Sequence, residues 1–93
     1  MLPKHRKVSH PGEILRELYV EPLGITQQTL SKHLGCTRVA INEILNGHRG
    51  ITPQMAFRLA DAFGTSPELW MNLQRDYDLQ EARKHHKRLP SIA

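Results

Sequence analysis

Helix-capping residues and glycines divide this 93-residue sequence into short apolar patterns with helical spacing. Threonine and serine side chains accept hydrogen bonds from the free N–H groups at a helix start, and glycine adopts the left-handed conformation that ends many helices. No stretch alternates apolar and polar residues for long enough to indicate a β-strand. The sequence therefore predicts an all-α domain. The predicted helix openings are Thr26, Thr37, Thr52-Pro53 and Ser66-Pro67, and the predicted stops are Gly24, Gly35, Asn46-Gly47 and Gly64.

Five short helices are expected from this punctuation. The first begins at Pro11 or Gly12 and is ended by Pro22 and Gly24, because a proline disfavours helical geometry in the residue before it. Its apolar residues at helical spacing are Ile14, Leu15 and Leu18. The other four helices are expected over about 27–34, 38–46, 53–63 and 67–80, where the apolar patterns run.

The positive charge of the chain lies at its two ends. Residues 1–10 carry a net charge of +3 and residues 83–93 a net charge of +4, so residues 11–82 are acidic although the whole chain is at +4. We therefore expect a basic arm over 1–10, one folded domain over 11–80 and a basic tail over 81–93. Basic ends attract polyanions without reading their sequence, and they can equally be solvated segments that keep the chain soluble.

The location of the protein is inferred from three features. The sequence has no run of about 20 apolar residues, so no membrane span is expected. No apolar segment follows the basic N-terminus, which argues against a secretory signal. The single cysteine, Cys36, excludes an internal disulfide and a cysteine-based zinc site. A cytoplasmic protein is expected.

The helix predicted over 38–46 has two contrasting faces. Ile41, Ile44 and Leu45 fall on one side of a helical wheel and are expected to be buried. Val39 and Asn42 fall on the opposite side, and Arg38 projects from the start of the helix. Arginine pairs with guanine, asparagine pairs with adenine, and a valine methyl group can contact the thymine methyl group. A single exposed valine is ordinary, but this combination predicts a face that reads bases in the major groove.

The segment over about 26–46 has the organisation of a helix-turn-helix, with a glycine-containing turn between two short helices. The free N–H groups at Gln27 and Gln28, in the first turn of the first helix, favour a phosphate contact. The loop after the second helix carries His48 and Arg49, which can contact the DNA backbone again. Two short helices joined by a turn also occur as structural elements in other α-bundles.

The sequence resembles the HigA-type antitoxins within the lambda-repressor-like (Cro, XRE) helix-turn-helix family. The core of the resemblance is residues 26–50, which read TQQTLSKHLGCTRVAINEILNGHRG. Three flanking segments sharpen it: HPGEIL over 10–15, EPLGIT over 21–26 and ITPQMAFRLADAFGTSPELWMNLQRDYDL over 51–79. The resemblance covers residues 8–79.

The resemblance implies a five-helix lambda-repressor-like DNA-binding domain with a dual role. Such proteins neutralise a HigB-like toxin, a ribosome-dependent mRNA endonuclease, and repress their own operon as homodimers on a palindromic operator. Some relatives are orphan XRE-type regulators with no toxin partner, and this alternative stays open. On the reading face the resemblance implies base contacts from Arg38, Val39, Asn42 and Glu43, and the acid at Glu43 can accept from cytosine or reject other bases. The expected phosphate contacts are Gln27, Gln28, Thr37, His48 and Arg49.

The dimer and toxin surfaces are expected on the last helix. Leu69, Leu73 and Tyr77 form an apolar stripe larger than so small a core needs, and it is the candidate dimer surface. An mRNA nuclease must be basic to hold RNA, so an acidic face is a plausible complement for the toxin. The first candidate is the segment 65–82, which carries Glu68, Asp76, Asp78 and Glu81 against Arg75 alone. The second is the first helix, with Glu13, Glu17 and Glu21.

No enzyme, metal site or cofactor is expected. His85 and His86 lie among four cationic residues, which repel a metal ion. Glu13 and Glu17 lie one helical turn apart and are interpreted as a solvated helix face, not as an acid–base pair. A nucleophile elbow, a phosphate-binding loop, a zinc-protease motif and a dinucleotide fingerprint are all missing from the sequence.

Overall fold

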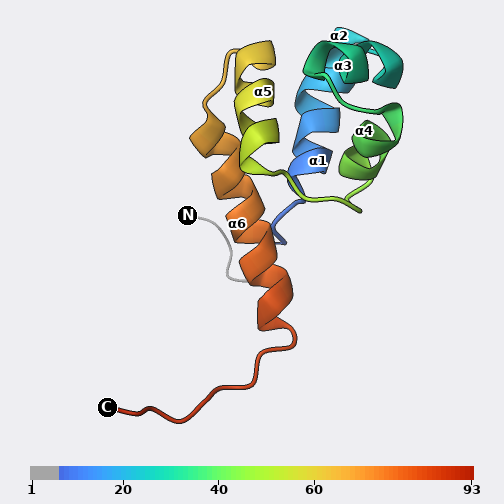
Figure 1. The fold of residues 1–93 in the computed structure, drawn as a ribbon. Helices are drawn as coiled ribbons and strands as arrows, with labels where there is room; N and C mark the ends of the chain where they lie inside the picture. Colours follow the sequence, from blue (N-terminus) through green and yellow to red (C-terminus); the bar gives the residue numbers. More distant parts are fainter. Residues whose placement is uncertain (1–6) are drawn as a thin grey trace.

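A computed structural model describes residues 7–93, so Lys4 and Arg6 of the expected basic arm lie outside the described part. Every regular element in the described range is helical (Figure 1). Because α1, η1 and α2 follow one another without a break, this range holds five helices, which confirms the predicted fold class. The elements are α1 (Pro11–Leu15), the π-helical turn η1 (Arg16–Val20), α2 (Glu21–Leu23), α3 (Gln27–Leu34), α4 (Arg38–Leu45), α5 (Pro53–Phe63) and α6 (Pro67–Arg83).

The first helix passes through Pro22, and the prediction that this proline ends it is wrong. A proline lacks an N–H group and its ring collides with the carbonyl group four residues earlier in an α-helix. The π turn over Arg16–Val20 changes the hydrogen-bond pattern just before the proline, and the Glu21 N–H donates to the Arg16 carbonyl oxygen five residues back. Gly24, at φ +64°, then ends the helix as predicted.

The four remaining helices begin at the predicted capping residues. The Thr26 hydroxyl accepts a hydrogen bond from the Thr29 N–H at 3.1 Å, and the Thr37 hydroxyl accepts one from the Ala40 N–H at 3.0 Å. Thr52 and Ser66 cap α5 and α6 in the same way. Such caps contribute about 1 kcal/mol each. The last helix continues to Arg83, three residues beyond the end of its apolar pattern.

The core lies where α1, α4, α5 and α6 meet. Trp70 of α6, Leu15 of α1 and Ile41 of α4 are fully buried, and Ile44 and Leu45 of α4 are buried with them, as the helical wheel predicts. Trp70 also donates its indole N–H to the Thr65 hydroxyl at 2.8 Å, which satisfies its one polar atom.

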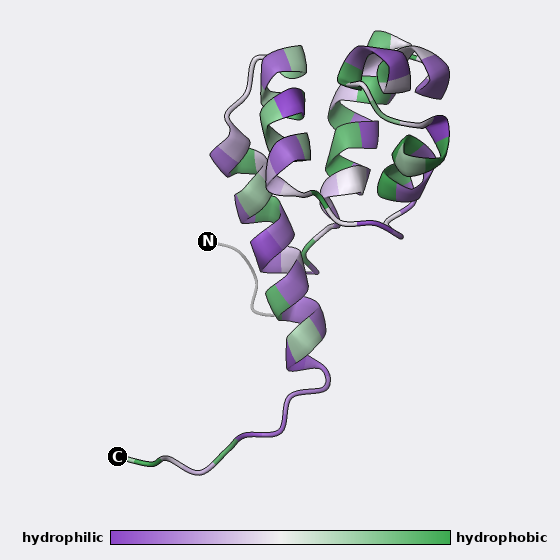
Figure 2. Cartoon of the chain, viewed as in Figure 1, coloured by the Kyte–Doolittle hydropathy of each residue, from purple (hydrophilic) through white to green (hydrophobic). Residues whose placement is uncertain are grey.

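The C-terminal half of α6 extends beyond the rest of the domain and continues into the tail (Figure 1), so the molecule measures 51 × 27 × 22 Å. This half is mainly hydrophilic (Figure 2). Gln80 holds the N-terminal segment against it, because its side chain accepts from the Val8 N–H at 2.6 Å and donates to the Val8 carbonyl oxygen at 3.1 Å. Within residues 7–93, no helix has the length and apolar character required to cross a bilayer.

His10 links the start of the first helix to α6. Its Nδ1 accepts a hydrogen bond from the Gly12 N–H at 2.9 Å, and its ring packs edge-on against the Tyr77 ring with centroids 4.8 Å apart. Burial lowers the pKa of His10, against the opposing effect of Asp78 and Glu13. A protonated Nδ1 cannot accept a hydrogen bond, so the fold requires the neutral ring.

We expect the free energy of unfolding to decrease as pH falls below about 6.5, the ordinary histidine pKa, because the unfolded chain then binds the proton that folded His10 refuses. The loss is complete below the lowered folded pKa of His10. His10→Asn keeps a capping acceptor that does not titrate, so it should flatten this pH dependence. Denaturant titrations between pH 5 and pH 8 measure it. An exposed-site control, His33→Asn, should leave the dependence in place, and an unchanged slope in His10→Asn would contradict the account.

Candidate nucleic-acid interface

The turn between α3 and α4 sets the angle between the two helices. Gly35 adopts φ +71° and donates its N–H to the Lys32 carbonyl oxygen at 3.3 Å, which closes α3. Thr37 then starts α4 two residues later. Ala40, a small residue in the first turn of α4, is buried. These residues form the helix-turn-helix that the sequence predicts over about 26–46.

The outer face of α4 brings together the residues predicted to read bases. Arg38, Val39 and Asn42 are all exposed, while Ile41, Ile44 and Leu45 on the opposite face are buried. Val39 is 66% exposed, although it is an apolar residue within a helix. Its exposure shows that the core does not use it. An apolar group flanked by arginine and asparagine is the chemistry that a major-groove face requires.

Asn42 is held by residues on both sides. Its side-chain amide donates to the Gln27 side-chain oxygen at 3.2 Å, which joins α4 to the first turn of α3. Asn46 donates to the Asn42 carbonyl oxygen at 2.9 Å and to its side-chain oxygen at 3.3 Å. The amide is thereby oriented before any ligand binds. Sequence reasoning missed this network, because Gln27 and Asn42 lie 15 residues apart and only the turn geometry joins them.

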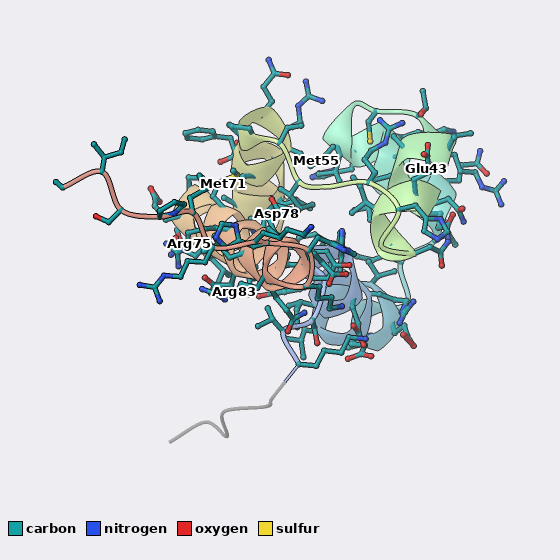
Figure 3. The ribbon with its side chains drawn as sticks, turned by 90° about the horizontal axis from the view of Figure 1, so that it is seen from below. Glu43, Met55, Met71, Arg75, Asp78 and Arg83 are labelled. Atoms are coloured by element: carbon teal, nitrogen blue, oxygen red, sulfur yellow. The ribbon has the colours of Figure 1, made fainter. Side chains whose placement is uncertain are left out.

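Glu43 differs from its three neighbours on α4. It is half-buried, and its carboxylate accepts from the Arg49 guanidinium at 3.0 Å. The pair neutralises the one acidic side chain on α4 and turns Arg49 back toward the helix. Figure 3 places Glu43 on α4, well apart from Arg75, Asp78 and Arg83 along α6.

Positive charge and free donors surround the turn. Gln28 is exposed in the first turn of α3, where backbone N–H groups lack intrahelical acceptors. The Thr37 oxygen accepts from the Ala40 N–H, which leaves the Thr37 hydroxyl proton free to donate. His48 is exposed in the loop after α4. Arg58 of α5 was missed from the sequence: its guanidinium donates to the Gly35 carbonyl oxygen at 3.4 Å, which adds a cation beside the turn.

The residues predicted for a dimer or toxin surface lie along α6. Leu69 is exposed, whereas Leu73 and Tyr77 are half-buried against the domain. Three of the acidic side chains have hydrogen-bond or ion-pair partners. Asp76 pairs with Arg75 at 2.9 Å, Asp78 accepts from Gln74 at 2.8 Å, and Glu81 pairs with Lys84 and accepts from the Tyr77 hydroxyl at 3.1 Å.

Gln74 is a second residue that sequence reasoning missed. It is buried, and its side-chain oxygen accepts from the Ile51 N–H at 2.7 Å while its amide donates to Asp78. The sequence does not indicate that a polar side chain in a helix will accept a hydrogen bond from a backbone N–H group in a distant loop. The loop after α4 carries His48 and Arg49, and Gln74 attaches this loop to α6. The loop is thereby held beside α4.

The residues that the structure describes bring no three His, Cys, Asp or Glu side chains together in a metal-binding arrangement.

A helix-turn-helix family model matches residues 15–70, more than half of the chain. The chain is 37% identical over 84 residues to antitoxin HigA-1 of Vibrio cholerae, which covers 90% of this chain and 78% of that protein. The chain belongs to the HigA-type helix-turn-helix family.

Solved structures of HigA-type proteins share the fold described above. A protein of the HigA family from Coxiella burnetii, described as an addiction module antidote protein, superposes with a TM-score of 0.81 at 44% identity and covers 86% of this chain and 87% of its own. The Pseudomonas aeruginosa antitoxin HigA with the higBA promoter superposes with a TM-score of 0.84 at 33% identity, over 94% and 100% of the two chains. This family consists of DNA-binding regulators and is not an enzyme family.

Proposed function

We propose that this HigA-type protein binds a palindromic operator as a homodimer, represses its own operon, and neutralises a HigB-like mRNA endonuclease toxin. The observation that carries the proposal is the outer face of α4, where Arg38, Val39 and Asn42 are exposed on a helix-turn-helix scaffold. The same scaffold occurs in the P. aeruginosa HigA that was solved with promoter DNA.

The proposed DNA contacts divide by chemistry. Arg38, Val39, Asn42 and Glu43 are the proposed base contacts, and Arg49 pairs with Glu43 in the free protein. Gln27, Gln28, Thr37, His48 and Arg49 contact phosphates and set the register of the helix on the duplex. Residues 26–50 carry Lys32, Arg38 and Arg49 against Glu43, so this segment is basic within an otherwise acidic domain. That local charge favours DNA at this face.

Neutralisation is tested by growth. The protein encoded beside this chain's gene is expressed from an inducible promoter, alone and together with this chain. We expect expression alone to stop growth and co-expression to restore it. If the neighbouring protein is harmless, or if co-expression gives no rescue, the chain is an orphan XRE-type regulator with no toxin partner, which is the competing function.

The homodimer is proposed to form through Leu69, Leu73 and Tyr77 on α6. One helix-turn-helix reads only a few base pairs, and a palindrome requires two copies about 34 Å apart. Leu69 and Leu73 lie in the N-terminal half of α6, where Leu69 is 38% exposed and open to a partner. Light scattering at tens of micromolar should give twice the 10.7 kDa mass of the chain.

Leu69→Asp should weaken the dimer about 30-fold, because a charge replaces the most exposed apolar side chain of the proposed interface. The matched control is Leu89→Asp in the tail, where the leucine is 78% exposed and should tolerate the change. A monomer that binds the operator at full strength would contradict the proposed dimer.

A further inference from the structure

The π turn in the first helix leaves two leucines outside the core. Leu18 lies within the turn and is 61% exposed, and Leu23, five residues later, is 63% exposed. Leu15 and Val20 of the same helix are buried, so the helix already supplies its share of the core. π turns recur at functional sites in other helices. Leu18 and Leu23 lie outside the buried core of the described domain.

Leu23 also lies on the rim of an apolar groove. The groove has a volume of about 260 Å³ and runs between the end of the first helix, α3 and the end of α5. Leu23, Ile25, Leu30 and Phe63 supply most of its apolar lining. Leu18, on the π turn of the same helix, is a second exposed leucine outside the groove. We call Leu18, Leu23 and this groove the α1 surface.

The α1 surface is bordered by acidic residues. Glu17 and Glu21 have side chains that are 53% and 62% exposed. Both share the single cation of this helix, because Arg16 lies 3.9 Å from Glu17 and 3.6 Å from Glu21. Arg16 also donates to the Leu45 carbonyl oxygen at 3.3 Å. With Glu13, the helix carries three carboxylates against one guanidinium, and the excess charge is negative.

We infer that the α1 surface is the docking site for the basic toxin, an inference that rests on the proposed antitoxin function. An enzyme that cleaves mRNA carries positive charge where it holds the RNA backbone, and this acidic, apolar surface complements it. The same carboxylates repel DNA, so the α1 surface is not a second nucleic-acid site. The alternative acidic surface on α6 offers less exposed apolar area, since Leu69 and Leu79 are 38% and 45% exposed.

The apolar part of the α1 surface contributes most of the affinity for the toxin, and its acidic border increases the association rate. The doubly substituted Leu18→Asp/Leu23→Asp protein should bind the toxin about 30-fold more weakly or worse, because both side chains are exposed anchors. Glu17→Lys/Glu21→Lys should slow association about tenfold at low salt and leave dissociation nearly unchanged. Titration and stopped-flow binding with the purified protein from the neighbouring gene measure both effects.

Controls separate docking from folding and from DNA binding. Leu89→Asp replaces an exposed leucine in the tail and should leave toxin affinity unchanged. The Leu18→Asp/Leu23→Asp protein should keep its thermal stability and its operator affinity, since neither leucine is in the core or on α4.

The growth assay distinguishes the possible results. Rescue by the wild-type chain and loss of rescue by Leu18→Asp/Leu23→Asp, with operator binding intact, supports the inference. Equal rescue by both proteins overturns the α1 surface while the antitoxin function stands. A wild-type chain that gives no rescue overturns the antitoxin function, and the inference with it. Conversion of the dimer to a monomer by the leucine substitutions, with full toxin affinity, would show that a second copy of the chain occupies the surface.

Discussion

Gly12→Ala should lower the free energy of unfolding by about 3 kcal/mol or more, which is large for a change of one methyl group. A Cβ atom built on Gly12 lies 1.6 Å from the Ile44 carbonyl oxygen and 2.6 Å from its carbonyl carbon. These are backbone atoms of α4, and they cannot rotate away as a side chain can. The first helix would have to move off α4, which would open the core at Leu15.

The chain offers a matched control for this effect. Gly24 adopts φ +64° and has open space around its Cβ position. Gly24→Ala therefore carries only the cost of the left-handed backbone, about 1 kcal/mol. Urea titrations of both variants give the comparison. If Gly12→Ala were no more destabilising than Gly24→Ala, the close packing of α1 on α4 would be wrong.

Arg38→Ala and Asn42→Ala should each weaken operator binding by about 1–3 kcal/mol and relax the preference for operator over other DNA. Both side chains are exposed on α4, so their removal should leave the fold intact. For Asn42 the loss includes its contact with Gln27, which orients the amide. Quantitative footprinting on operator and scrambled duplexes, at one salt concentration, measures affinity and preference together.

Gln28→Ala supplies the contrast for the base contacts. A phosphate contact carries no sequence code, so this variant should weaken binding to both duplexes about equally. Gln28 is as exposed as Arg38 and lies in the same motif, which makes it a fair comparison. An equal loss on both duplexes for Arg38→Ala would mean that Arg38 contacts the backbone and that its assignment as a base contact is wrong.

Helix order and helix starts could be predicted because they depend on local chemistry. Thr26, Thr37 and Thr52 each cap a helix with a hydroxyl group three residues from its donor, an interaction encoded within one turn. The buried stripe of α4 followed in the same way from helical periodicity. Pro22 is the exception among the local signals, because a π turn accommodates it and its sequence resembles that of a helix end.

Contacts between distant segments could not be predicted. Asn42 and Gln27 meet only because the turn brings α4 across the start of α3, and Gln74 reaches Ile51 across 23 residues. Gly12 was predicted as a possible helix start, but its need for close approach depends on the path of α4. The individual base, phosphate, dimer and toxin contacts remain predictions, since each involves a molecule outside this chain.

The central claim is that α4 reads DNA sequence. It is tested most directly by titrating the wild-type protein against a duplex from the promoter region of its own operon and against a scrambled duplex of equal length and composition, both at the same salt concentration. The account predicts binding to the promoter duplex at least about 10³-fold tighter, in the range of specific protein–DNA recognition. Equal affinity for the two duplexes, with the same dependence on salt, would contradict it.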